Sequence, residues 1–463
     1  MPRFLVFLTL FVSQASFGNE LTLPNNLKAR LEHLVNNYPS GFAAEVWDMQ
    51  NRQIIFSGNR EVSLNPASVM KLLTTKVAID LLGIGFRWNT DVLTKGIIKN
   101  NTLDGDLYFR GSGDPTMDLV RFNALVKSIY DVGIHSIKGN VLIDRSNFPD
   151  DTHDPGHFDN EPLRPYNAGA DALPINANVF NIHFIPRPET QTVDLISSPL
   201  NAPVVNQLQV ATGACAKWPK NPIIENGQIY FRGAYPLSCG IKQRQYSLLS
   251  PSLFFENAFR TEWATLGGTF DGSILENKTP DDAKMFLEST SEPIASALRV
   301  TNKWSSNLAA RNIFLTLSLQ LSEQAGLETS RTLVKRWAEN HGISTKGVFI
   351  DNGSGLSRNG RVTVAAVSKI LNIAWLDPSM PEFISSFSIP GVDGTLKSKF
   401  HSSPVNSKAH LKTGYLEGVR SIAGYLHLPQ GRTLSVVIIM NHESLTKSSK
   451  TMENLVESLF QTK

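Results

Sequence analysis

Ser68 lies three residues before Lys71 in the stretch NPASVMKLLTT, residues 65–75. In a helix this spacing places both side chains on one face, so the amine can reach the hydroxyl. A serine hydroxyl attacks a carbonyl only when a neighbour takes its proton. A lysine does this when burial or nearby positive charge favours its neutral form. The pattern predicts a nucleophile with its base.

This pattern alone is weak evidence, because residues 444–447 form a second Ser-x-x-Lys in a polar stretch where the lysine would be solvated and charged. Ser-x-Asn is weaker still, since it occurs at residues 57–59, 63–65 and 305–307. Neither pattern identifies a site by itself.

A third motif, and the order in which the three motifs occur, make a chance match much less plausible. Lys412, Thr413 and Gly414 form the only Lys-Thr-Gly in the chain, on a predicted strand where a glycine lets a substrate backbone approach closely. Ser-x-x-Lys, then Ser305-x-Asn307, then Lys-Thr-Gly is the three-part signature of penicillin-binding proteins and serine β-lactamases.

The elements that must position these residues lie at both ends of the chain. Asn65 can cap a helix that begins there and is apolar through Leu82. Residues 88–280 read as short strands with few long helices, helical patterns return after residue 292, and the last hundred residues contain three strands and a helix from about Ser444. We expect an α/β (α+β) domain formed discontinuously by residues 19–87 and 281–463, with a β-rich insertion over 88–280 that forms one or two small subdomains.

Length and charge agree with this division. A chain of 463 residues fits roughly two or three domains of about 150 residues. The formal net charge of +3 comes without a basic cluster, which argues against nucleic acid as a partner.

The N-terminus resembles an export signal. Arg3 precedes an apolar run over residues 4–12 and small residues up to Gly18, so residues 1–18 are predicted to be a signal peptide; a buried N-terminal helix is the alternative. No other run approaches about 18 apolar residues, so no transmembrane segment is expected in the mature chain.

Cys215 and Cys239 are the only two cysteines. In an oxidising compartment such a pair is most simply a disulfide, and two buried free thiols are the alternative. A metal site is disfavoured because neither cysteine belongs to a CxxC pattern or has a nearby histidine pair.

Further segments carry a resemblance to one family. Besides the three motifs, residues 110–116, 139–148, 351–358, 390–396 and 411–426 resemble D-alanyl-D-alanine carboxypeptidase/endopeptidases of the penicillin-binding protein 4 type. The resemblance implies a penicillin-binding/serine β-lactamase-like transpeptidase domain. It also implies a large insertion between the first two motifs, which β-lactamases lack.

The resemblance assigns catalytic roles residue by residue. Ser68 would attack a D-Ala-D-Ala or D-Ala-diaminopimelate bond and become the acyl-enzyme, with Lys71 as general base. Ser305 would relay a proton to the departing amine. Asn307 would hold Lys71 and the substrate peptide group.

It also assigns binding roles. Lys412 would bind the substrate carboxylate, assisted by Thr413, and would have to stay charged, which would lower the pKa of Lys71. The oxyanion hole would be formed by the N–H groups of Ser68 and Tyr415. Tyr415 follows Gly414, where family members often have threonine, so the hydroxyl contact to the carboxylate is in doubt. Arg358 would lie near the substrate side chain.

The acidic loop PDDTHDPGHFDNE, residues 149–161, leaves three interpretations open. His153 and His157 have a spacing that binds zinc on a helix, but Pro155 and Gly156 favour a loop between them. A solvated loop is the second interpretation. The third, implied by the resemblance, is that Asp151 or Asp154 pairs with the amine of a diaminopimelate side chain.

The resulting hypothesis is an exported, periplasmic serine DD-peptidase that needs no cofactor or metal. Its partners would be peptidoglycan stem peptides and cross-links, with β-lactam antibiotics as covalent inhibitors. The oligomeric state stays open, with a dimer among the alternatives. The rival functions are a β-lactamase or esterase on the same scaffold and a non-catalytic wall-binding protein.

Overall fold

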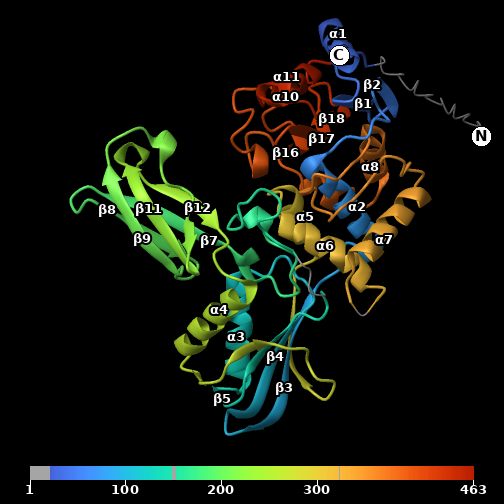
Figure 1. Cartoon of the computed structure of the whole chain (residues 1–463). Coiled ribbons are helices and arrows are strands. Elements are labelled where there is room, and N and C mark those ends of the chain that lie inside the picture. Colours follow the sequence, from blue (N-terminus) through green and yellow to red (C-terminus); the bar gives the residue numbers. More distant parts are fainter. Residues whose placement is uncertain (1–20, 149–152, 323, 463) are drawn as a thin grey trace, which may run out of the picture.

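A computed structural model describes residues 21–148, 153–322 and 324–462 (Figure 1). The predicted signal peptide therefore lies outside the described residues. An antiparallel sheet of five strands carries the C-terminal motif at its edge. Its strands lie in the order β16 (Ala409–Leu416), β17 (Val419–His427), β18 (Thr433–Met440), β1 (Phe42–Asp48) and β2 (Gln53–Gly58).

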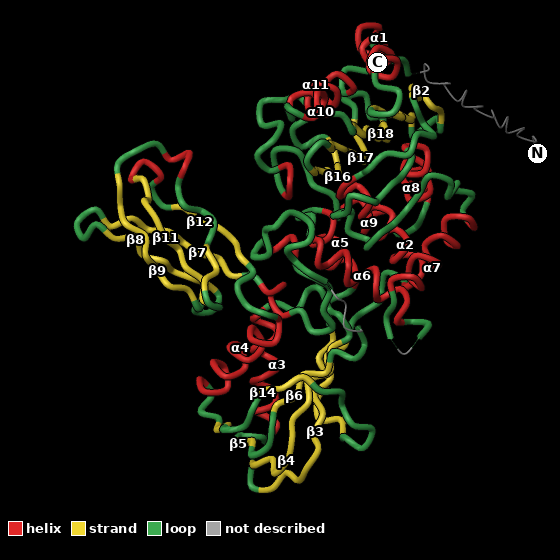
Figure 2. The backbone as a smooth tube through the Cα atoms, viewed as in Figure 1, coloured by secondary structure: helices red, strands yellow, loops and turns green. Residues whose placement is uncertain are grey.

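Helices cover both faces of this sheet (Figure 2). One core contains residues of α2 (Met70–Leu82), α5 (Ile294–Asn302), α6 (Asn307–Leu319), α7 (Leu327–Asn340), α8 (Val364–Leu376) and α9 (Met380–Ser385). The core on the other face contains residues of α1 (Asn25–Asn37) and α11 (Lys450–Leu459), with the short α10 (Glu443–Thr446) beside it.

The central strand β18 illustrates why the sheet needs two cores. Its sequence TLSVVIIM is buried throughout, with Val437 and Ile439 in the first core and Val436 and Ile438 in the second. Successive side chains of a strand point to opposite faces, so a strand covered on both sides is apolar without alternation.

The chain between α2 and α5 forms two further sheets, which lie outside the part that contains these helices (Figure 1). The first has seven strands: β3 (Asn89–Lys99), β4 (Thr102–Gly111), β5 (Ser136–Ile137), β6 (Val141–Asp144), β13 (Thr269–Phe270), β14 (Ile274–Glu276) and β15 (Lys284–Thr290). The turn from β3 to β4 contains Asn100 and Asn101, both with positive φ, as a tight hairpin turn requires. Because β15 pairs with β3, this sheet extends past residue 280; the domain boundaries at 87/88 and 280/281 stay a prediction.

The second of these sheets has six strands and projects to one side in Figure 1. In chain order they are β7 (Phe180–Arg187), β8 (Thr192–Ser198), β9 (Val204–Ala211), β10 (Ile223–Glu225), β11 (Gln228–Pro236) and β12 (Lys242–Tyr246). Cys215 and Cys239 form a disulfide beside this sheet, with Cα atoms 4.8 Å apart, which confirms the predicted pairing.

Two long helices in this middle region were not expected. They are α3 (Leu119–Val132) and α4 (Pro251–Thr265). Leu119, Phe122, Val126 and Ile129 give α3 an apolar face at helical spacing, and Asp118 caps it. In α4 the buried residues Phe254, Phe255, Phe259 and Trp263 likewise share one face.

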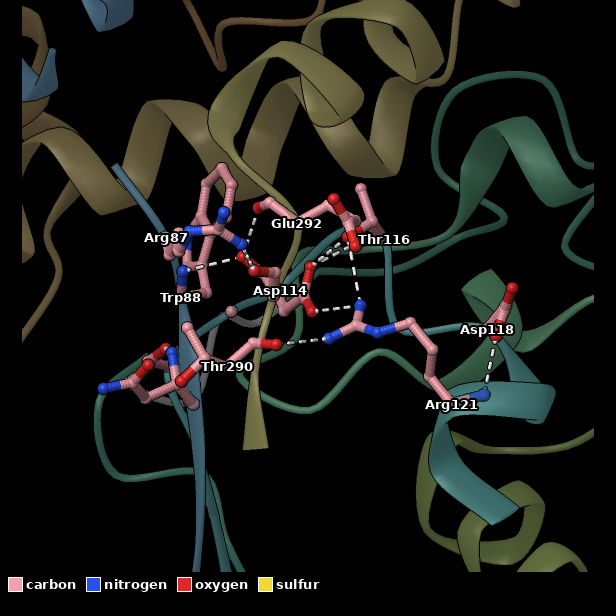
Figure 3. Close-up of polar contacts among 12 residues, drawn as sticks. Arg87, Trp88, Asp114, Thr116, Asp118, Arg121, Thr290 and Glu292 are labelled. Carbon is pink, nitrogen blue, oxygen red and sulfur yellow. Dashed lines mark hydrogen bonds and ion pairs between the residues drawn. The ribbon is translucent and has the colours of Figure 1, made fainter. Parts of the chain in front are cut away.

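The segment 110–116 begins at the end of β4 and contacts α6, because Asn312 donates to the carbonyl of Gly113. Asp114 is buried and accepts hydrogen bonds from the backbone and hydroxyl of Thr116 and from Arg121. Arg121 also donates to the carbonyl of Thr290, where the chain returns from β15 (Figure 3). This segment therefore ties the end of β4 to α6 rather than contributing chemistry.

Candidate active site

Ser68 lies in a tight turn that precedes helix α2. The predicted helix start at Asn65 is wrong by several residues: a 3₁₀ turn spans Ala67–Val69, and α2 begins at Met70. Ala67 has φ of +45°, a conformation that non-glycine residues rarely adopt. Asn65 Oδ1 holds this turn by accepting the Ala67 N–H at 2.9 Å. The turn leaves Ser68 half-buried at the end of a rigid helix.

Lys71 is fully buried and its Nζ lies among three oxygens. It lies 3.0 Å from Ser68 Oγ, 2.6 Å from Asn307 Oδ1 and 2.5 Å from the carbonyl oxygen of Ser354. An amide oxygen and a carbonyl oxygen only accept hydrogen bonds, so they engage two amine protons. The lone pair of a neutral amine is then free to face the hydroxyl of Ser68.

Electrostatics favour that neutral form. Burial lowers the pKa of Lys71 well below its usual value, and the positive charges of Lys412 and Arg311 lower it further. Desolvation and like charge both disfavour an ammonium ion. Lys71 is therefore suited to accept the proton of Ser68.

The Ser-x-Asn segment links the two lysines of the site. Ser305 has φ of +60° in the short loop between α5 and α6, and its Oγ accepts a hydrogen bond from Lys412 Nζ at 2.8 Å. Ser306 caps α6, and Asn307 begins it. Asn307 reaches Lys71 with Oδ1 and donates from Nδ2 to the carbonyl of Tyr166 at 2.8 Å.

Lys412 lies on the edge strand β16 and is also fully buried. Its Nζ donates to Ser305 and, at 2.7 Å, to the carbonyl of Thr413. Burial lowers the pKa of Lys412 to about 7. Burial thus works against the expected charge on Lys412, and a carboxylate bound beside Nζ would favour its ammonium form.

Gly414 lets β16 pack closely against the turn that contains Ser68. A Cβ at this position would lie 2.1 Å from Ser421 Oγ and 2.5 Å from the carbonyl oxygen of Pro66. The Ser421 hydroxyl donates to that same carbonyl, which ties β17 to the turn before Ser68. Tyr415 is therefore the next residue along an edge strand packed against this turn, and its side chain is 64% exposed.

Within the described ranges, the Arg358 side chain forms no hydrogen bond or ion pair with Ser68, Lys71 or Asn307. Its guanidinium lies 4.7 Å from the ring centre of Phe158, and Nη1 donates to the carbonyl of Glu417 at 3.3 Å. Half of its side-chain surface is exposed. These two contacts place Arg358 between the β16–β17 hairpin and the loop that contains Phe158.

The acidic loop is only partly described. Asp151 lies outside the described residues. Asp154 is exposed and accepts the N–H of Gly156 at 2.7 Å, as in a turn, and His157 is exposed. His153 instead points to the carbonyl of Asn167 at 2.6 Å. Among residues the structure describes, no three His, Cys, Asp or Glu side chains gather as a metal site requires.

Sequence reasoning missed two contributions to the site. The first is the backbone of residues 166–168: Tyr166 accepts from Asn307, and Ala168 accepts from Arg311. The second is Arg311 itself, which is buried one helical turn after Asn307. The spacing of four could have indicated that Arg311 shares a face with Asn307. The backbone contact has no sequence signal.

Comparisons with known proteins agree with these motifs. The family model described as "D-Ala-D-Ala carboxypeptidase 3 (S13) family" matches residues 26–462. D-alanyl-D-alanine carboxypeptidase DacB of Haemophilus influenzae is 25% identical over 447 residues, which cover 93% of this chain and 91% of that protein.

Solved structures resemble the fold. Crystal structures of penicillin binding protein 4 from Haemophilus influenzae include one that covers 93% of this chain and 98% of its own, with a TM-score of 0.78 at 22% identity, and another complexed with a β-lactam. Bd3459, a predatory peptidoglycan endopeptidase from Bdellovibrio bacteriovorus, covers 90% of this chain and 92% of its own, with a TM-score of 0.54 at 15% identity. The predicted fold class and the resemblance to the penicillin-binding protein 4 type are confirmed, and this chain belongs to the D-Ala-D-Ala carboxypeptidase 3 (S13) family of serine peptidases.

Proposed function

We propose that this protein is a serine DD-peptidase of peptidoglycan, acting on D-Ala-D-Ala termini and on D-Ala-diaminopimelate cross-links. The observation that carries the proposal is the position of Lys71: it is fully buried, its Nζ lies 3.0 Å from Ser68 Oγ, and burial lowers its pKa. Family membership supports the substrate class.

In the proposed reaction, Ser68 Oγ attacks the carbonyl of the penultimate D-Ala while its proton moves to Lys71. The N–H groups of Ser68 and Tyr415 would stabilise the oxyanion. The C–N bond then breaks and the amine leaves with a proton relayed through Ser305. This step leaves an acyl-Ser68 ester, which water hydrolyses with Lys71 again taking a proton.

The remaining predicted residues would bind the substrate. Lys412 and Thr413 would hold the carboxylate of the leaving residue. Lys412 lies on the edge strand β16, and a bound carboxylate would raise its lowered pKa and so favour the charged ammonium. Arg358 would contact the substrate side chain, and Asp151 or Asp154 its amine. These four assignments follow from the family resemblance and from the placement of Lys412.

The proposal includes a location and an inhibitor. Export to the periplasm rests on the signal peptide predicted at residues 1–18. The described residues contain no helix long and apolar enough to cross a membrane. A β-lactam would acylate Ser68 in place of substrate, in line with the β-lactam complex of the related penicillin binding protein 4.

The test is the intact mass of the mature protein after incubation with benzylpenicillin. We expect one covalent adduct on the wild type and none on Ser68→Ala. An unmodified wild type, or an adduct that persists in Ser68→Ala, would contradict the proposal. A chromogenic cephalosporin then separates the rival: a burst with slow turnover supports a peptidase, and sustained rapid hydrolysis supports a β-lactamase.

Purified muropeptides define the substrate. Release of D-alanine from monomeric pentapeptide measures carboxypeptidase action, and conversion of cross-linked dimers to monomers measures endopeptidase action. Both should disappear in Ser68→Ala. Loss of neither would indicate that Ser68 is not the nucleophile.

A further inference from the structure

Arg420 lies across the sheet from the residue that follows the Lys-Thr-Gly motif. In the β16–β17 ladder Tyr415 pairs directly with Arg420, so both side chains point to the same face. The guanidinium carbon of Arg420 lies 3.8 Å from the centre of the Tyr415 ring, in a cation–π contact. The ring therefore holds the guanidinium beside the edge strand.

Within the described part of the chain, this arginine has no anionic partner. Its Nε is buried without a hydrogen-bond partner, and its guanidinium forms no ion pair. Burial lowers the pKa of Arg420, although a guanidinium stays protonated at any physiological pH. A partly buried cation without an acceptor is costly, and an incoming anion would remove that cost.

The position of Arg420 relates it to the substrate carboxylate. Thr413 and Tyr415 are two residues apart on β16 and so share a face. Arg420 is the diagonal neighbour of Thr413 across the ladder, where Cα atoms lie about 7–8 Å apart and long side chains still make contact. A carboxylate at the Thr413 hydroxyl would thus be within reach of the Arg420 guanidinium.

We infer that Arg420 is a second cation for the carboxylate of the leaving residue, and that Tyr415 positions it. This inference rests on the proposed function. It explains how a tyrosine can follow the motif, where a threonine would offer a hydroxyl: the ring instead holds a guanidinium that makes charge-assisted hydrogen bonds. Arg420 would therefore determine selectivity for a free carboxylate over an amidated terminus.

The experiment compares two substrates, diacetyl-L-Lys-D-Ala-D-Ala and its C-terminal carboxamide. For the wild type, kcat/KM should be much higher for the carboxylate. In Arg420→Gln this carboxylate-to-carboxamide ratio should fall at least 10-fold, and Arg420→Lys should recover part of it. The matched control is Arg232→Gln, because Arg232 is an exposed arginine paired with Glu225 on another sheet; its ratio should equal that of the wild type.

A ratio unchanged in Arg420→Gln, or equal losses on both substrates, would overturn the inference. Thermal melting of each variant identifies losses that come from misfolding. Tyr415→Ala should also lower the carboxylate-to-carboxamide ratio, because the Arg420 guanidinium loses its cation–π contact with the ring.

Binding to the Ser68→Ala protein keeps the test independent of turnover. Calorimetry should give at least 10-fold tighter binding of the carboxylate tripeptide than of its carboxamide. Adding Arg420→Gln should reduce that preference by the same factor as it reduces the kinetic ratio, with Lys412 accounting for what remains. No preference in Ser68→Ala would overturn the inference even where benzylpenicillin acylates the wild type. Absence of acylation, by contrast, would count against the proposed function.

Discussion

The chain contains two Ser-x-x-Lys patterns, and the structure places them in opposite surroundings. Lys71 is fully buried and contacts Ser68, Asn307 and Ser354, with its pKa lowered by burial and two cations. Lys447 is exposed, and the hydroxyl of Ser444 interacts with Tyr38 instead of a lysine. The same local spacing thus gives a buried amine in one place and an exposed amine in the other.

The difference lies in what surrounds each helix. The first pair lies beside α6, the loop before α6 and the edge strand β16, which contribute Asn307, Ser305 and a second buried lysine, Lys412. The second pair lies on the surface near α11. A desolvated amine near other cations loses its proton readily, whereas an exposed one keeps it.

The largest expected effect is that of removing the buried amine. Lys71→Met should slow acylation by benzylpenicillin about 10²- to 10⁴-fold, the range of a lost general base. Lys447→Met, which removes the amine of the second pair, should leave the rate unchanged. Stopped-flow acylation rates on both variants test this. Comparable slowing in both would erase the distinction between the two pairs.

The next largest effect concerns Lys412, the second buried lysine beside Ser68 and Lys71. Among the described residues, the exposed pair Ser444 and Lys447 has no such neighbour. Lys412→Gln should lower kcat/KM for a carboxylate substrate about 10- to 100-fold, since a hydrogen bond to a charged group contributes about 1.5–3 kcal/mol. A small ester without the carboxylate should lose less. Steady-state kinetics on both substrates measure the two losses, and equal losses would contradict carboxylate binding by Lys412.

The pH dependence of kcat/KM should distinguish the two buried amines. Activity needs Lys71 neutral, so it should rise as pH passes upward through the lowered pKa of Lys71. It also needs Lys412 protonated, so for a carboxylate substrate it should decline above about pH 7, the pKa of free Lys412. With a carboxamide substrate the alkaline decline should weaken. A decline identical for both substrates would assign that limb to another group.

The smallest expected effect is that of Arg311, whose positive charge lowers the pKa of Lys71. Arg311→Gln removes this charge, so the acidic limb should move to higher pH, by less than any shift caused by removing the Lys412 charge. Arg311→Lys keeps the charge and should restore the limb, although it changes the contact with Ala168. Arg299→Gln, on the exposed side of α5, is the control. If the acidic limb of the pH profile does not move in Arg311→Gln, the role of Arg311 would be restricted to its hydrogen bond with the Ala168 carbonyl.

Much of the fold was predictable where periodicity is strong. The three C-terminal strands were expected from apolar runs and lie at 409–416, 419–427 and 433–440. The start of the nucleophile helix was misplaced because Ala67 adopts a positive φ, which depends on contacts with β17 far along the chain. The helices α3 and α4 were not singled out, although each has buried apolar residues at helical spacing, because the segments around them read as strands and turns.

Residue types and order were enough to single out the candidate nucleophile, its base and the carboxylate-binding lysine, because this chemistry needs those groups and few other patterns combine them. Only the tertiary structure brings Asn307 and Ser354 onto Lys71 and places Arg311 and Arg420 beside the site. These contacts join segments more than two hundred residues apart or opposite strands of a hairpin. Local spacing carries no information on burial or on the charges that set the pKa of an amine.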